Sequence, residues 1–295
     1  MSAQAAKPPQ PFKKRVDPVN IFLNVWGVLV YGFLFLPILM IVIFSFNKGR
    51  ALLAWEGFGT NWYSGLPDNQ AILDAVSTSL KAAVGAAIIA TILGSFAGIA
   101  LARRPGKWTI GFMAIVFLVL VTPEIVDAIS LLIWFVRLKG PFGPDNTLIN
   151  YGLMRLWVGH SLFATAVVTL IVRARLEGLD ESLEEAGADL YAPPVRRFRQ
   201  ITLPLMMPAV LAGGLLAFSL SLDNTIISTF VSVAGASPWP VYVFGSLRAI
   251  LRPEIASMST LMLLLTLVAL GLVALVLKRS GDSAEDVAKT FAAGG

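Results

Sequence analysis

The sequence predicts an all-α polytopic membrane protein with six transmembrane helices. Only 14% of the 295 residues are charged and 56% are hydrophobic, whereas soluble domains contain about 25% charged residues. Six apolar segments are each long enough to cross a bilayer core about 30 Å thick. None of the polar segments between them has the pattern of a separate soluble domain. We therefore expect one transmembrane domain over residues 20–277.

Each apolar segment has features that suit a helix within a bundle. The first contains Pro37, which neighbouring transmembrane helices can accommodate. The second contains Gly94 and Gly98, small residues that let helix backbones approach closely. The third is interrupted by Thr-Pro-Glu at 122–124. The predicted spans are 20–46, 75–102, 109–138, 151–172, 205–233 and 256–277.

The distribution of basic residues indicates how the spans cross the membrane. Six spans place both termini on the same side. If that side is the cytoplasm, 15 of the 23 lysine and arginine residues lie in cytoplasmic segments, as the positive-inside rule requires. We therefore expect both termini to be cytoplasmic, with residues 1–19 as a disordered basic tail and residues 278–295 as a second tail.

Composition excludes several classes of function. The chain has no cysteine, which excludes disulfides, thiolate metal sites and thiol catalysis. Its only histidine is His160, in the fourth span, where a buried neutral imidazole bonded to a neighbouring helix is expected and no metal site can be built. The net charge of +5 comes without a basic domain that contains interleaved aromatic residues, so nucleic acid is not an expected partner.

A polar segment between the fourth and fifth spans, residues 176–204, has the pattern of a helix–turn–helix. Residues 177–190 contain helix formers with acids near the start, and Pro193-Pro194 predicts a sharp turn. A second helix, which contains Arg196, Arg197 and Arg199, would then lead into the fifth span. Such a pair of helices along the membrane surface could transmit force from a cytoplasmic partner, and the alternative is a solvated loop between spans.

The segment resembles the EAA loop of type I permeases of ATP-binding-cassette (ABC) importers. In that pattern Glu-Ala-Ala is followed by a glycine and then by Ile-x-Leu-Pro, and the chain has Glu185-Ala186-Gly187, then Ile201 and Leu203-Pro204 at the same spacing. Two departures are Gly187 in place of the second alanine and Tyr191 in place of the glycine. If that glycine adopts a positive φ, a tyrosine there costs about 1 kcal/mol or more.

Motifs outside the loop are similar to those of the PotC-type permeases of spermidine/putrescine importers. These motifs are Gly57-Phe58 before Trp62-Tyr63, Pro123-Glu124-Ile125, Ala128-Ile129-Ser130-Leu131-Leu132, Gly159-His160, Ser221-Leu222-Asp223-Asn224, Pro240-Val241-Tyr242 and Pro253-Glu254-Ile255.

The resemblance implies a heteromeric importer in the bacterial cytoplasmic (inner) membrane. Its other parts would be a second, PotB-like permease, two ATPase subunits and an external substrate-binding protein. ATP and Mg²⁺ would be bound by the ATPases, because this chain has no Gly-x-x-x-x-Gly-Lys-[Ser/Thr] phosphate loop. We therefore expect a chain that is not itself an enzyme and holds no cofactor. The implied ATPase-coupling residues are Glu184, Glu185, Ala186, Gly187, Asp189, Leu190, Tyr191, Ala192, Leu203 and Pro204.

A path for a polycation is suggested by acidic and aromatic residues in or beside the spans. Asp223, Glu124 and Asp127 lie within or at the ends of apolar segments, where an unpaired carboxylate is costly and needs a cavity, a cation or a substrate. Aromatic faces can bind ammonium groups. The candidates for this path are Asp223, Glu124, Asp127, Trp62, Tyr63, Asn224 and Trp239.

Each of these residues also has a structural interpretation, and the substrate has alternatives. The tryptophans suit an interfacial belt, and Glu124 and Asp127 suit the outer interface. Asn224 stands where the related permeases often have an acid. Permeases of the same type carry ferric iron, thiamine or opines. An ATP-independent channel or secondary carrier is a further alternative, which would leave the loop at 176–204 without a role.

Overall fold

The computed structural model describes residues 18–50, 54–142, 152–247 and 253–279. Within these ranges every regular element is a helix, and one isolated bridge pairs Asn47 with Phe58. The predicted all-α class is therefore confirmed. The predicted tails, residues 1–19 and 278–295, lie almost entirely outside the described residues.

Among the described residues, five helices are long and apolar enough to cross a membrane, and a bent helix pair is the sixth candidate. The pair consists of α4 (Lys107–Val121) and α5 (Glu124–Phe142), which meet at an angle of 103°. The predicted six spans are obtained only if this pair counts as one span. The five single candidates are α1 (Pro18–Phe44), α3 (Gln70–Arg103), α7 (Gly152–Glu177), α13 (Pro253–Arg279) and the continuous helix Pro194–Leu222.

The continuous helix Pro194–Leu222 consists of three segments. It begins with α9 (Pro194–Arg197), passes through the π-helical turn η2 (Phe198–Thr202) and continues as α10 (Leu203–Leu222). The prediction that this span begins near residue 205 and runs to 233 is therefore wrong at both ends. The backbone leaves the helix at Asp223, and a separate short helix, α11 (Ile226–Val231), follows. The side chains of Asn224 and Thr225 form local hydrogen bonds with the backbone of Ser228 and Asp223, and such bonds compete with helix continuation.

Two further predicted helix boundaries differ from those in the structure. The fourth span continues as α7 to Glu177, five residues beyond the predicted end at 172. The helix predicted over 177–190 is shorter, because α8 covers only Ser182–Asp189. Between them the Asp180 carboxylate accepts a hydrogen bond from the Ser182 backbone N–H at 2.9 Å. This turn separates the two helices, and the same bond lowers the pKa of Asp180 below its ordinary value.

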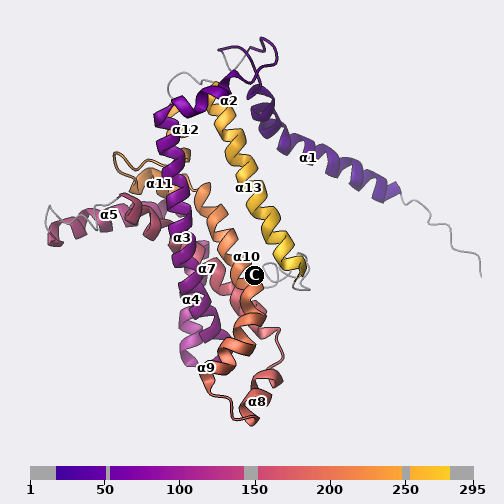
Figure 1. The fold of residues 1–295 in the computed structure, drawn as a ribbon, viewed down its shortest axis with the longest axis vertical. Coiled ribbons are helices and arrows are strands. Elements are labelled where there is room, and N and C mark those ends of the chain that lie inside the picture. Colours follow the sequence, from indigo (N-terminus) through magenta and orange to yellow (C-terminus); the bar gives the residue numbers. More distant parts are fainter. Residues whose placement is uncertain (1–17, 51–53, 143–151, 248–252, 280–295) are drawn as a thin grey trace, which may run out of the picture.

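The core of the bundle is formed by α3, α7 and α10, which pack on one another along their lengths (Figure 1). Gly94 and Gly98 of α3 face the backbone of α7. A Cβ added at Gly94 would lie 2.7 Å from Val168 Cβ, and one at Gly98 would lie 2.9 Å from the Thr169 carbonyl oxygen. The close helix approach predicted from these glycines is confirmed.

The two ends of this bundle differ in structure (Figure 1). At one end, called here the α12 end, lie α12 (Trp239–Ser246) and α2 (Asn61–Gly65), which pack with α3 and α13. At the other, the α8 end, lie α8 and α9. The first helix, α1, continues through Pro37 and extends away from the bundle with its side chains largely exposed.

Candidate functional site

Two regions of the fold contain the residues singled out in the sequence: the turn between α8 and α9, and the breaks in the α4–α5 and α10–α11 helices. The α8–α9 turn is a Schellman-type helix end. The Tyr191 N–H donates to the Ala188 carbonyl at 2.8 Å, and the Ala192 N–H donates to the Gly187 carbonyl at 3.1 Å. This pattern needs a left-handed residue at the position of Tyr191.

Tyr191 is the one non-glycine residue with positive φ in the described part of the chain, at +55°. The condition stated for this position is met, since the backbone here does adopt the conformation that glycine prefers, and the cost to a tyrosine stays a prediction. A side chain in that conformation costs about 1 kcal/mol. Tyr191 is 95% exposed, so packing against the described part of the chain does not compensate for the cost. Strain combined with exposure is typical of a residue that is kept for a partner.

The turn presents an apolar surface, which we call the α8 tip. It consists of exposed side chains from α8, the turn and the start of α9. Tyr191 lies at its centre, and its members are Leu183, Leu190, Tyr191 and Val195. An apolar cluster of this kind at one end of a membrane protein is typical of a protein-docking surface.

The ten predicted coupling residues divide into an outward and an inward group. Glu184 and Leu203 are partly buried, and Gly187 is fully buried, where a Cβ would lie 2.9 Å from Ile201 Cδ1. The departure from alanine at Gly187 therefore allows α8 to pack closely on η2. Ala192 is half-buried. The exposed members are Glu185, Ala186, Asp189, Leu190, Tyr191 and Pro204.

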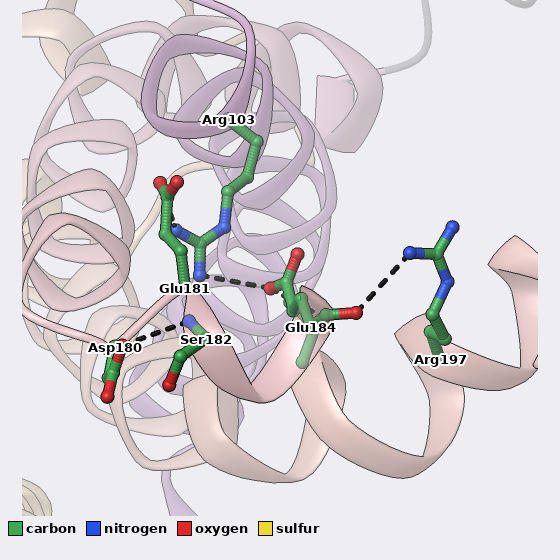
Figure 2. A network of polar contacts seen from close by, with 7 residues as sticks. Arg103, Asp180, Glu181, Ser182, Glu184 and Arg197 are labelled. Carbon is green, nitrogen blue, oxygen red and sulfur yellow. Dashed lines mark hydrogen bonds and ion pairs between the residues drawn. The ribbon is translucent and has the colours of Figure 1, made fainter. Parts of the chain in front are cut away.

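Beneath this surface lies an ion-pair network that the sequence did not indicate (Figure 2). Arg103, the last residue of α3, contacts Glu181 Oε1 through Nη1 at 2.9 Å and Glu184 Oε1 through Nη2 at 3.0 Å. The same Glu184 oxygen accepts a hydrogen bond from Thr202 Oγ1 at 3.0 Å. The Glu184 carbonyl accepts a bond from Arg197 Nη1 at 3.4 Å. In the sequence, Arg103 counts only as one of the basic residues that indicate the topology.

The second region joins the two helix breaks. The Asn224 side-chain amide, between α10 and α11, donates a hydrogen bond to Glu124 Oε1 at the start of α5. The Ser228 N–H donates in turn to Asn224 Oδ1 at 3.3 Å. Glu124 and Asn224, which are 100 residues apart in the chain, are thus brought into direct contact. Asp223 is the exposed neighbour of Asn224, and Asp127 lies one turn beyond Glu124 and is partly buried.

His160 connects the same region to α7. Its side chain is 4% exposed, with Nδ1 2.7 Å from Ser221 Oγ and Nε2 2.9 Å from Ser228 Oγ. A neutral imidazole satisfies both contacts, because one ring nitrogen donates and the other accepts. The prediction of a buried imidazole bonded to a neighbouring helix is confirmed. Since Ser221 lies in the last turn of α10 and Ser228 lies in α11, His160 holds the two sides of the break together.

The predicted aromatic residues lie in a different part of the molecule, at the α12 end. Trp62 Nε1 donates to the Gly49 carbonyl at 3.2 Å, and the Tyr63 hydroxyl lies 2.7 Å from Ser45 Oγ. Trp239 is 5% exposed and stacks on Tyr242. Their assignment to a substrate path stays a prediction, since the structure gives each of them a packing role.

Apolar helices interrupted by breaks that bear polar side chains are a recurring feature of membrane transport proteins. Residues 90–282 match the family described as "Binding-protein-dependent transport system inner membrane component". The chain belongs to this family, and it is an inner-membrane protein with multiple membrane helices.

Curated relatives agree with this assignment. The chain is 42% identical over 240 residues to the putrescine transport system permease protein PotI of Escherichia coli K12, covering 80% of this chain and 84% of PotI. It is 35% identical over 257 residues to the spermidine/putrescine transport system permease protein PotC of Haemophilus influenzae, covering 87% of this chain and 96% of PotC. The sequence resemblance to the PotC-type permeases is therefore confirmed.

Two solved structures show that the fold is shared more widely. One is a bacterial ABC transporter involved in the import of the acidic polysaccharide alginate, with a TM-score of 0.68 and 13% identity over 89% of this chain and 95% of that one. The other is an amino acid ABC transporter, with a TM-score of 0.52 and 18% identity over 74% of this chain and 98% of that one. At these identities the comparison concerns the fold alone.

Proposed function

We propose that the chain is a transmembrane permease subunit of an ATP-driven ABC importer for polyamines, spermidine or putrescine. The observation that supports this most is its 42% identity to a putrescine permease over 84% of that protein. The second permease would be PotB-like, and the two subunits together would form the translocation path. Two ATPase subunits and an external substrate-binding protein would complete the importer.

The carboxylates at the helix breaks support a cationic substrate. Asp223, Glu124 and Asp127 lie at the ends of helices, where broken backbone and side chains become accessible from a path. A carboxylate within the membrane is costly unless it has a cationic or hydrogen-bonding partner. Asn224 neutralises none of this charge, because it only donates a hydrogen bond to Glu124. A diammonium or triammonium substrate passing the breaks would supply the missing cations.

Coupling to ATP hydrolysis is assigned to the α8 tip. In the proposed topology both termini are cytoplasmic, so α8 and α9 are cytoplasmic coupling helices. Leu190 and Tyr191 would enter a groove on an ATPase, with Glu185 and Asp189 at its rim. ATP and Mg²⁺ would be bound by the ATPases, and their closure would move α8 and thereby the membrane helices.

Uptake of labelled solutes tests this function. The assembled complex would be reconstituted in proteoliposomes with the binding protein outside and ATP inside, because inverted vesicles do not suit an importer. Putrescine, spermidine, thiamine or ferric iron would then be added outside. ATP-dependent uptake of a polyamine alone is expected. Uptake of thiamine or iron instead would change the proposed substrate but leave the assignment as an ABC permease intact. Uptake without ATP would favour a secondary carrier.

A further inference from the structure

Arg103 links the segment that carries the α8 tip to a helix that is remote from it in the sequence. Its guanidinium bridges Glu181, just before α8, and Glu184, within α8. Glu184 in turn accepts a hydrogen bond from Thr202, the last residue of η2. One cation and one carboxylate therefore join α3, α8 and η2 (Figure 2).

The network is stronger than an ordinary surface ion pair. Isolated exposed pairs contribute little because water and salt screen them and two side chains must be ordered. The Arg103 side chain is only 15% exposed and contacts two carboxylates at 2.9 Å and 3.0 Å. Its position in the last turn of α3 also suits the negative end of the helix dipole. The planar fork of arginine matches this two-point contact, whereas the single ammonium of lysine does not.

Two routes lead from α8 into the membrane, and they differ in stiffness. The covalent route passes through η2, a π-helical turn, then past Pro208 within α10, and ends at the break at Asp223. Both the π turn and the proline are sites where helices bend. The route through Arg103 enters α3, a helix of 34 residues without proline, about 51 Å long at 1.5 Å per residue.

The far end of α3 reaches the α12 end. Asn69, its N-cap, donates to Glu254 Oε2 at 3.0 Å, and Ser79 Oγ accepts from the Trp239 N–H at 2.8 Å. Close packing at Gly94 and Gly98 holds the C-terminal third of α3 against α7. A displacement applied at Arg103 would thus be transmitted to the opposite end of the bundle.

We infer that Arg103 is a positioning residue for energy coupling, which makes α3 a second and stiffer transmission route from the α8 tip to the α12 end. The inference rests on the proposed function, because it assumes that the α8 tip docks on an ATPase. It adds that the ion pairs of the Arg103 guanidinium hold the α8 tip to α3, so that the tip and α3 move together.

The test compares uptake per ATP hydrolysed in the reconstituted complex. Arg103→Ala should still co-purify with the ATPases, but uptake per ATP should fall about fivefold or more, the lower range of typical coupling energies. The matched control is Arg104→Ala, since Arg104 is the exposed neighbour, and it should keep the wild-type ratio. Arg103→Lys should give an intermediate ratio. The double variant Arg103→Glu with Glu184→Arg should recover part of the loss seen with either single change.

A second readout follows the movement itself. Because the chain has no cysteine, spin labels can be placed at Arg104→Cys, directly after α3, and at Ser182→Cys on α8. One narrow distance distribution is expected with and without bound nucleotide, and Arg103→Ala should broaden it.

The outcomes separate the two claims. If the wild-type complex contains no ATPase or shows no ATP-dependent uptake, the proposed function fails. If wild type is coupled but Arg103→Ala or Arg103→Lys keeps the wild-type ratio, the inference is overturned. Should Arg103→Ala fail to insert, failure of the charge exchange to restore coupling in an inserted complex would overturn it as well.

Discussion

Replacing Tyr191 by glycine separates the two consequences of having a tyrosine at the α8–α9 turn. The residue has a φ of +55° and a side chain that is 95% exposed. Glycine removes both the strain and the ring, whereas alanine removes the ring and keeps the strain. The relief of strain is about 1 kcal/mol, which changes a local opening equilibrium about fivefold.

Hydrogen exchange of the chain in lipid nanodiscs measures this opening. The reporter is the Ala192 amide, which is bonded to the Gly187 carbonyl at 3.1 Å. In Tyr191→Gly it should exchange about fivefold more slowly than in wild type, and in Tyr191→Ala at about the wild-type rate. Equal or faster exchange in the glycine variant would refute the strain argument.

The ring is tested by binding of the partner ATPase to the same nanodiscs. Aromatic residues at the centre of an interface often contribute more than 1 kcal/mol, so both variants should bind about tenfold more weakly than wild type. Wild-type affinity in both variants would remove Tyr191 from the docking surface while leaving the strain result intact.

Three further substitutions probe the two regions. Glu185→Lys should insert normally but lose ATPase stimulation, because it reverses an exposed charge on α8; normal coupled hydrolysis would remove α8 from its role. Asp223→Asn should slow uptake at limiting polyamine without changing assembly, and unchanged uptake would return Asp223 to a structural role. His160→Leu leaves the hydroxyls of Ser221 and Ser228 without their buried partner, so the free energy of unfolding should fall by about 1–3 kcal/mol. The triple variant that also changes both serines to alanine should recover part of that loss, and no recovery would contradict the pairing.

Much of the fold could be predicted because a bilayer imposes long apolar helices. The positions of α1, α3, α7 and α13 follow from hydropathy, although some of their ends differ by several residues. The fifth span was misjudged because residues 205–233 are apolar enough to continue through Asp223, whereas the break depends on local side-chain hydrogen bonds together with a contact to Glu124. The angle of 103° between α4 and α5 likewise depends on packing that composition does not encode.

The candidate site was predictable where its chemistry is local. The positive φ at Tyr191 follows from its place in a spaced motif, and the burial of His160 follows from its apolar segment. The Arg103 network was missed because its residues are 78 and 81 positions apart, and no local pattern pairs them. The contact between Glu124 and Asn224 spans 100 positions and was missed for the same reason.

The central claim, that this permease couples ATP hydrolysis to polyamine import, is tested most directly by ATP hydrolysis of the co-purified complex. The complex would be placed in lipid nanodiscs with its binding protein, and spermidine, putrescine, thiamine and ferric iron would be titrated separately. Stimulation by a polyamine alone is the expected result. A complex without any ATPase, or with stimulation only by thiamine or ferric iron, would contradict it.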